Sequence, residues 1–94
     1  MNTQKTVTLR DRITRYTAVC PAAVSGEHGH NQTLKVAIAL IHGFDLSPEV
    51  AQEFIIPWNN RCVPPWKERD LKRKLQEADK LAPRNGNPRG YLLK

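Results

Sequence analysis

The segment NQTLKVAIALIH, residues 31–42, constrains the fold most because it is apolar on nearly every side. Its apolar residues form one helical stripe and a flank beside it: Leu34, Ala37, Ile38, Ile41, Val36, Leu40. Only Lys35 interrupts the segment, and the period-two alternation of a half-exposed strand is missing, although a buried strand over VAIALI is the alternative. We predict a central buried helix that begins at the cap Asn31 and stops at Gly43.

The length of the chain leaves room for one domain. A chain of 94 residues buries only about two thirds of the surface that its unfolded form exposes, so its core must be small. Hydrophobic residues are 39% and charged residues 26%, an ordinary globular balance that argues against a wholly disordered chain. We expect a single helical domain over residues 1–94, with an ordered core at about 8–82 and a tail or linker over 83–94.

A short amphipathic helix is predicted near the N-terminus from three apolar residues at helical spacing: Leu9, Ile13, Tyr16. Thr8 is suited to cap its start, with Asp11 in the first turn. Pro21 disfavours helical backbone at the residue before it, so this helix must end by Cys20.

Another helix start is predicted at Ser47-Pro48-Glu49, which combines a side-chain cap, a proline at the first helical position and an early carboxylate. The apolar face that follows consists of Val50, Ala51, Phe54, Ile55 and Trp58. Pro57 removes one backbone donor, so we expect an irregular last turn.

The last helix is predicted over residues 67–81, after an extended Pro64-Pro65-Trp66 corner. Its apolar face consists of Leu71, Leu75, Ala78 and Ala82. Its polar face consists of Arg69, Arg73, Gln76 and Lys80. Together these patterns predict an all-α fold, a small bundle of about four helices with flexible ends.

The charge of the chain favours a polyanionic partner. Lys and Arg total 15 against 9 for Asp and Glu, giving a net charge of +6, and residues 61–94 hold ten basic side chains against four acidic ones. The sequence contains no apolar run long enough for a transmembrane span and no apolar signal segment, so we expect a cytoplasmic domain without membrane contact.

The sequence lacks the common motifs for phosphate binding, metal binding and catalysis. It contains neither a GxxxxGK[ST] nor a GxGxxG phosphate loop, and its carboxylates are scattered. The cysteines and histidines do not have the spacing of common zinc sites: Cys20, Cys62, His28, His30, His42. We therefore expect no catalytic activity of the chain by itself, no cofactor and no metal.

The strongest functional signal is a set of cations around an aromatic residue, which are candidate nucleic-acid contacts: Arg61, Trp66, Lys67, Arg69, Arg73, Lys74, Lys80. Cations displace counterions from phosphates, and an indole is able to stack on an unpaired base. The alternatives are a merely solvated helix face and an indole that belongs to the core.

Residues Cys20 to Lys80 resemble the primase C-terminal (PriCT-like) helical domain, which follows the catalytic core in primase-polymerase proteins of phages, plasmids and integrated elements. The resemblance depends on elements in order: the loop Pro21 to His30, the turn Gly43 to Ser47, Trp58-Asn59 with Arg61-Cys62, Pro64-Pro65-Trp66, and a closing helix with Leu71, Lys74 and Ala78. Gly90-Tyr91-Leu92-Leu93 is similar to the exit segment of that family. Lys67, where a Ser-like cap is usual, and Pro57 depart from the pattern.

The resemblance implies an all-helical accessory domain that joins a primase-polymerase core to a helicase region of the same parent protein. Its expected partner is the single-stranded DNA template, and its role is to assist template binding and primer initiation. His28, His30 and Asn31 are candidate nucleotide or phosphate contacts. We expect the isolated domain to be a monomer. The alternative function is a non-catalytic adaptor that docks the core to the helicase region or to another protein.

Overall fold

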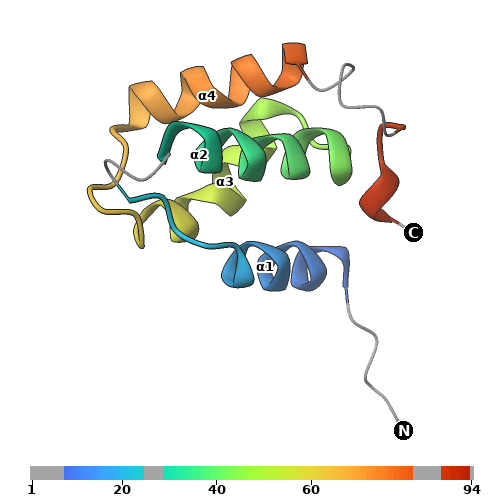
Figure 1. Cartoon of the computed structure of the whole chain (residues 1–94). Helices are drawn as coiled ribbons and strands as arrows, with labels where there is room; N and C mark the ends of the chain where they lie inside the picture. The colour runs from blue at the N-terminus through green and yellow to red at the C-terminus, as the bar shows by residue number, and fades with distance from the viewer. Residues whose placement is uncertain (1–7, 25–28, 82–87, 94) are drawn as a thin grey trace, which may run out of the picture.

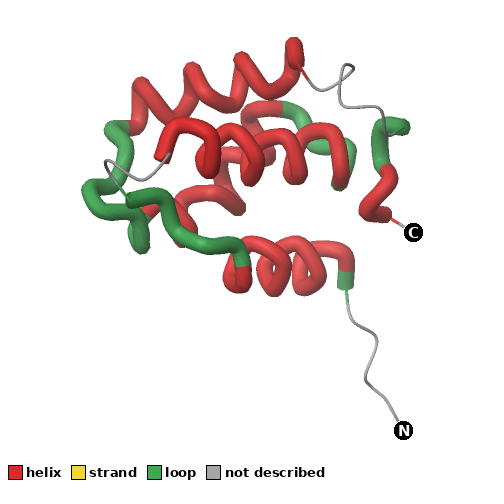
Figure 2. The backbone as a smooth tube through the Cα atoms, viewed as in Figure 1, coloured by secondary structure: helices red, strands yellow, loops and turns green. Residues whose placement is uncertain are grey.

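The computed structural model describes residues 8–24, 29–81 and 88–93. Its main helices are α1 (Leu9–Val19), α2 (Gly29–Ile38), α3 (Pro48–Asn59) and α4 (Glu68–Leu81). Two short elements, η1 (Ala39–Gly43) and η3 (Tyr91–Leu93), complete the fold. Figure 2 shows helices joined by loops, without a strand in the described ranges. This arrangement confirms the predicted small all-α bundle.

The layering of the bundle places α2 and α3 between α4 and α1 (Figure 1). α4 packs against both α2 and α3, whereas α1 packs against α3. The core is built from the apolar faces of all four helices, and its largest fully buried side chains include Trp58, Ile13, Leu40, Ile55 and Leu71. No helix within the described ranges is long and apolar enough to cross a bilayer.

The start and end of α1 agree with the prediction. The Thr8 hydroxyl accepts a 3.1 Å hydrogen bond from the Asp11 N–H, and the Asp11 carboxylate accepts one from the Thr8 N–H, which completes a capping box. The helix ends at Val19, and Cys20 has extended backbone (φ −69°, ψ 131°) before Pro21.

The central helix is buried as predicted, but its ends differ from the prediction. α2 begins at Gly29, so Asn31 lies inside the first turn and the assignment of Asn31 as the cap is wrong. After Ile38 the chain widens into the π-helical turn η1, in which the Phe44 N–H donates to the Ala39 carbonyl at 3.0 Å. The left-handed residue that follows is Asp45 (φ 56°).

Gly43 has a packing role at the end of η1. All five residues of η1 are buried, and the side chain of Leu92 lies against Gly43. A β-carbon at position 43 would lie 2.9 Å from Leu92 Cγ, closer than packed carbons approach one another. The glycine therefore permits a close contact between the C-terminal segment and the central helix.

α3 also begins as predicted. The Ser47 hydroxyl accepts a 3.3 Å hydrogen bond from the Val50 N–H, and Pro48 occupies the first turn. The helix continues past Pro57 to Asn59, and Pro57 is exposed.

α4 begins at Glu68, directly after Lys67, and buries Leu71, Leu75 and Ala78 as predicted. Ala82 lies outside the described residues.

The Pro-Pro-Trp corner is held by two residues of α3 and by the loop before α2. The Asn59 side chain donates to the Trp66 carbonyl at 3.0 Å and accepts from the Trp66 N–H at 2.9 Å. The Trp58 indole N–H donates to the Pro21 carbonyl at 3.0 Å, and the Val63 N–H donates to the Ala23 carbonyl at 2.9 Å. The corner is thus tied to the bundle by hydrogen bonds, with a cis peptide bond between Val63 and Pro64.

Residues 88–93 contact the bundle, although they fall in the segment expected to be a tail. The Gly90 N–H donates to the His42 carbonyl, and the Arg12 guanidinium donates to the Leu92 carbonyl at 2.8 Å. The Tyr91 ring lies 6.0 Å from the imidazole of His42. Residues 83–87 and Lys94 of the expected tail lie outside the described residues.

Candidate nucleic-acid interface

One side of α4 carries cations that point away from the core. Arg69, Arg73 and Lys80 recur at helical spacing and are exposed, whereas the buried Leu71 and Leu75 occupy the opposite side. The described part of the chain contains no ion pair to any of these three cations. From Arg69 to Lys80 the row extends about 16 Å along the axis, at the ordinary rise per helical residue.

Lys72 joins the same side of α4, and the sequence prediction missed it. Its ammonium lies 3.9 Å from the Glu68 carboxylate, and both side chains are exposed. An exposed pair of this kind is weak and leaves the ammonium accessible to another anion. We call the set Arg69, Lys72, Arg73 and Lys80 the α4 cation face. Lys67 is exposed immediately before it.

Trp66, predicted to stack on a base, is instead engaged within the bundle. Its indole N–H donates a 2.7 Å hydrogen bond to the Thr33 hydroxyl, and its ring packs against the core cluster. The Lys74 ammonium lies 5.4 Å from the ring centroid. The structure therefore favours the alternative in which this indole belongs to the wall of the core.

Lys74 is likewise not part of the α4 cation face. Only 13% of its side chain is exposed, and its ammonium lies 3.7 Å from the Glu77 carboxylate. Contacts with Glu77 and Trp66 neutralise and partly cover this charge. The sequence pattern includes Lys74 because it lies among other cations along the chain, but its angular position on the helix places it beside the core.

Arg61, also predicted to contact phosphate, holds the end of α1. Its Nη2 donates 2.9 Å hydrogen bonds to the carbonyls of Thr17 and Cys20. These carbonyls lie at the C-terminal end of α1, where few backbone N–H groups remain to satisfy them; the Thr17 carbonyl also accepts from the Cys20 N–H at 3.3 Å. The guanidinium therefore serves the fold as a C-terminal cap that reaches across from the end of α3.

The two thiols lie near this cap and are in unreactive surroundings. Burial raises the pKa of the Cys20 thiol, and the nearby charge of Arg61 offsets only part of that effect. Burial also raises the pKa of Cys62, whose side chain is in the core. A higher pKa leaves less thiolate at neutral pH, which makes either cysteine a poor nucleophile.

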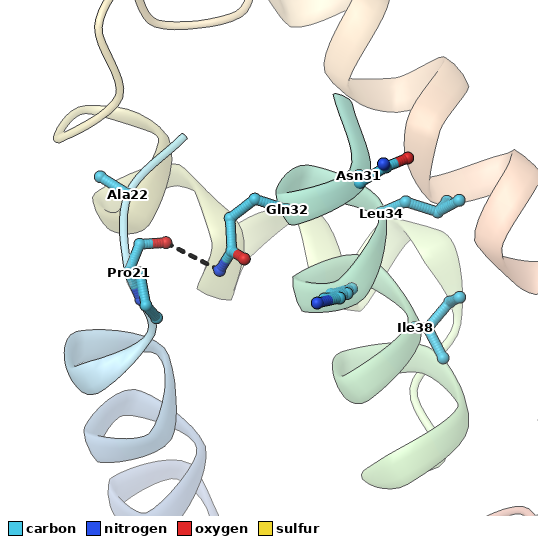
Figure 3. A pocket seen from close by; sticks show the side chains of 7 residues that line it. Pro21, Ala22, Asn31, Gln32, Leu34 and Ile38 are labelled. Carbon is cyan, nitrogen blue, oxygen red and sulfur yellow. Dashed lines mark hydrogen bonds between the residues drawn. The ribbon is translucent and has the colours of Figure 1, made fainter. Parts of the chain in front are cut away.

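Among the candidate nucleotide contacts, Asn31 is the residue whose side chain the structure describes. His28 lies outside the described residues, and His30 is placed only by its backbone in the first turn of α2. Asn31 is exposed on α2 and lines an open groove of about 550 Å³ (Figure 3). The other residues lining the groove are Pro21, Ala22, Gln32, Leu34, Lys35 and Ile38.

The groove is bridged at its base by a hydrogen bond. The Gln32 side chain points across it and donates to the Pro21 carbonyl at 2.9 Å (Figure 3). This bond joins α2 to the segment that follows α1, so the groove is a gap between two fixed walls. Among the described residues that line it, Lys35 carries the one charge. Elsewhere in the described ranges, histidine, cysteine and carboxylate side chains form no group that could hold a metal ion.

Comparisons with protein-family models, curated proteins and solved structures find no match to this chain. The class of protein that the structure defines is a small all-α bundle with an exposed row of cations on its last long helix.

Proposed function

We propose that this chain is a non-catalytic helical domain that binds a single nucleic-acid strand through the α4 cation face. The main support for this proposal is that Arg69, Arg73 and Lys80 are exposed in one row, with no ion pair to them in the described ranges. Exposed cations of this kind are able to replace the counterions of a phosphate backbone.

The chemical groups on the α4 cation face indicate how strongly binding should depend on salt and on base sequence. Guanidinium and ammonium groups contact phosphates but do not distinguish one base from another. Trp66 is engaged with Thr33 and Lys74, so the proposal includes no base stacking on it. We therefore propose binding that depends strongly on salt and little on sequence, with no chemical step and no cofactor.

The biological setting of the proposal comes from the sequence. The resemblance of residues Cys20 to Lys80 to the primase C-terminal domain supports a role in template binding and primer initiation beside a primase-polymerase core and a helicase region. The resemblance implies an all-helical domain, and the chain is a small all-α bundle. The template strand is then the polyanion that meets the α4 cation face.

Charge reversal on α4 tests the proposal. The ligand is a fluorescein-labelled single-stranded oligothymidylate, followed by fluorescence anisotropy. Arg69→Glu with Arg73→Glu is expected to weaken binding at least about tenfold at low salt, because two phosphate contacts become repulsive. Arg15→Glu with Lys35→Glu is the matched control, since it changes the net charge equally at exposed residues of α1 and α2.

Salt dependence provides the second readout of the same experiment. Four phosphate contacts on a single strand predict a slope of about −3 for log K against log salt concentration. Unchanged affinity in the Arg69→Glu, Arg73→Glu variant, or an equal loss in the control, would exclude the α4 cation face as the binding surface.

An adaptor function is the second candidate, and exposed apolar side chains favour it. Val19 is 78% exposed, Val63 is 62% exposed and Ile56 is 44% exposed. If the chain is an adaptor, short oligonucleotides at low salt will leave its amide NMR signals unmoved, whereas a purified primase-polymerase core will shift them.

A further inference from the structure

Arg89 reaches the C-terminal end of α4 from the segment 88–93. Its Nε lies 2.5 Å from the Asp45 carboxylate, and its Nη1 lies 3.5 Å from the Asp79 carboxylate. Its Nη2 also donates to the Leu46 carbonyl at 3.3 Å. One guanidinium therefore joins the C-terminal segment, the loop before α3 and the last turns of α4.

Asp79 is a carboxylate at the edge of the α4 cation face, on the side of the helix that carries Lys72. It immediately precedes Lys80 in α4 and lies on the exposed side of the helix, about two turns from Lys72. An uncompensated carboxylate at that place would repel a phosphate approaching Lys80. Asp45 would add a second negative charge close by, since the same guanidinium contacts both carboxylates.

Resting on the proposed function, we infer that Arg89 is a determinant of polyanion affinity because it offsets part of the negative charge of Asp45 and Asp79 beside the α4 cation face. The charges lie close together, because the Arg89 guanidinium is within 3.5 Å of the carboxylates of both Asp45 and Asp79. The hydrogen bond to Asp45 is the largest influence that raises the pKa of Arg89, and Asp79 contributes in the same direction.

A purely structural role for Arg89 makes a different prediction. The segment 88–93 has other anchors, namely the two hydrogen bonds from Arg12 to the carbonyls of Leu92 and Leu93 and the contact of Leu92 with Gly43. Replacing Arg89 leaves these anchors in place. If Arg89 only holds the segment in place, replacing it will leave phosphate binding on α4 unchanged. If Arg89 offsets the charge of the carboxylates, replacing it will weaken that binding.

A double-mutant cycle on affinity separates these roles. The variants are Arg89→Gln, Asp79→Asn and their combination, each titrated against the same labelled oligothymidylate. Arg89→Gln is expected to weaken binding about threefold to fivefold, the range of one exposed charge interaction. Asp79→Asn is expected to raise affinity less in the wild type, where Arg89 shields that carboxylate, than in the Arg89→Gln background, where it recovers most of the loss.

The exposed pair Arg10 and Glu53 provides a matched control cycle. The Arg10 Nη2 lies 3.4 Å from the Glu53 Oε1, and both side chains are exposed. This pair joins α1 to α3, away from α4. Arg10→Gln and Glu53→Gln change the net charge as the test pair does, and their coupling in oligonucleotide affinity is expected to be zero. A general effect of net charge would appear equally in both cycles.

The outcomes distinguish the inference from the proposed function. If the wild-type chain does not bind the oligonucleotide, the proposed function fails. If it binds and the Arg89–Asp79 cycle shows no more coupling than the control cycle, the inference alone is overturned. Arg89→Lys keeps the charge and is expected to stay within about twofold of the wild type. An Arg89→Lys variant as weak as Arg89→Gln would also overturn it.

Discussion

The indole N–H of Trp66 donates a 2.7 Å hydrogen bond to the hydroxyl of Thr33, so the corner before α4 is fastened to the central helix. Thr33 is fully buried in α2, and the Trp66 backbone is held by Asn59 of α3. These contacts join three helices at one point. They fix where α4 begins and therefore which of its sides faces outward.

Thr33→Val is expected to destabilise the fold by about 1–3 kcal/mol, because the indole N–H loses its acceptor while the side-chain volume is nearly kept. Urea denaturation followed by circular dichroism measures the loss. Thr14→Val is the control, since Thr14 is exposed on α1. Equal free energies of unfolding for the two variants would show that the hydrogen bond contributes nothing.

Trp66→Phe is expected to lower stability but to leave oligonucleotide affinity within about twofold of the wild type, because phenylalanine keeps an aromatic ring but loses the donor to Thr33. Anisotropy titration under conditions in which the variant is fully folded provides the measurement. A strong loss of affinity in Trp66→Ala that phenylalanine rescues would instead identify a base-stacking platform.

Arg61→Met is expected to cost about 1–3 kcal/mol of stability, because the carbonyls of Thr17 and Cys20 lose a charged donor. Thermal unfolding of this variant is compared with that of Arg15→Met, which removes the same charge from an exposed position. Oligonucleotide affinity is expected to be equal in the two variants. A larger loss of affinity in Arg61→Met would return Arg61 to the binding surface.

Stability is expected to fall at alkaline pH. Burial raises the pKa of Cys20, Cys62 and Tyr16 above their ordinary values. A group whose folded-state pKa is raised contributes stability that is complete below its unfolded pKa and is lost as pH rises through the folded value. The decline is therefore expected to set in at pH about 8.5, where the thiols of the unfolded chain are half ionised.

Free energies of unfolding in urea, measured from pH about 7 to about 9.5, test this alkaline decline. Cys20→Ala with Cys62→Ala is the comparison variant. It is expected to be less stable at neutral pH, because Cys62 is buried in the core, but to depend less on pH. A decline as steep in this variant as in the wild type would show that the thiols are not its source.

Much of the fold was predictable because the signals are local. The capping box of Thr8 and Asp11 and the cap at Ser47 join residues three apart in sequence, so the residue types alone indicate them. The Asn31 cap was wrong because α2 begins two residues earlier, at Gly29. The π-helical turn η1 was also missed. The helix widens there where all the residues of the turn are buried, and this burial depends on the tertiary packing.

The candidate site was predictable only where helical periodicity decides exposure. Arg69, Arg73 and Lys80 lie outward as predicted, because the leucine side of the same helix must face the core. Lys72 was missed because its position lies at the edge of the row. Arg61 and Lys74 were predicted for their charge, but Arg61 bonds to Thr17, 44 positions away, and Lys74 pairs with Glu77 and lies over the Trp66 ring.

By itself the sequence determined the helices, most of their boundaries and the outward side of α4, because caps and periodic apolar residues act over one or two turns. Only the tertiary structure decided that Arg61 caps α1, that Trp66 bonds to Thr33 and that Arg89 returns to Asp45 and Asp79. Arg61 and Thr17 are 44 positions apart, as are Arg89 and Asp45. Partners so distant in sequence meet only after the core has packed, since no local backbone preference brings them together.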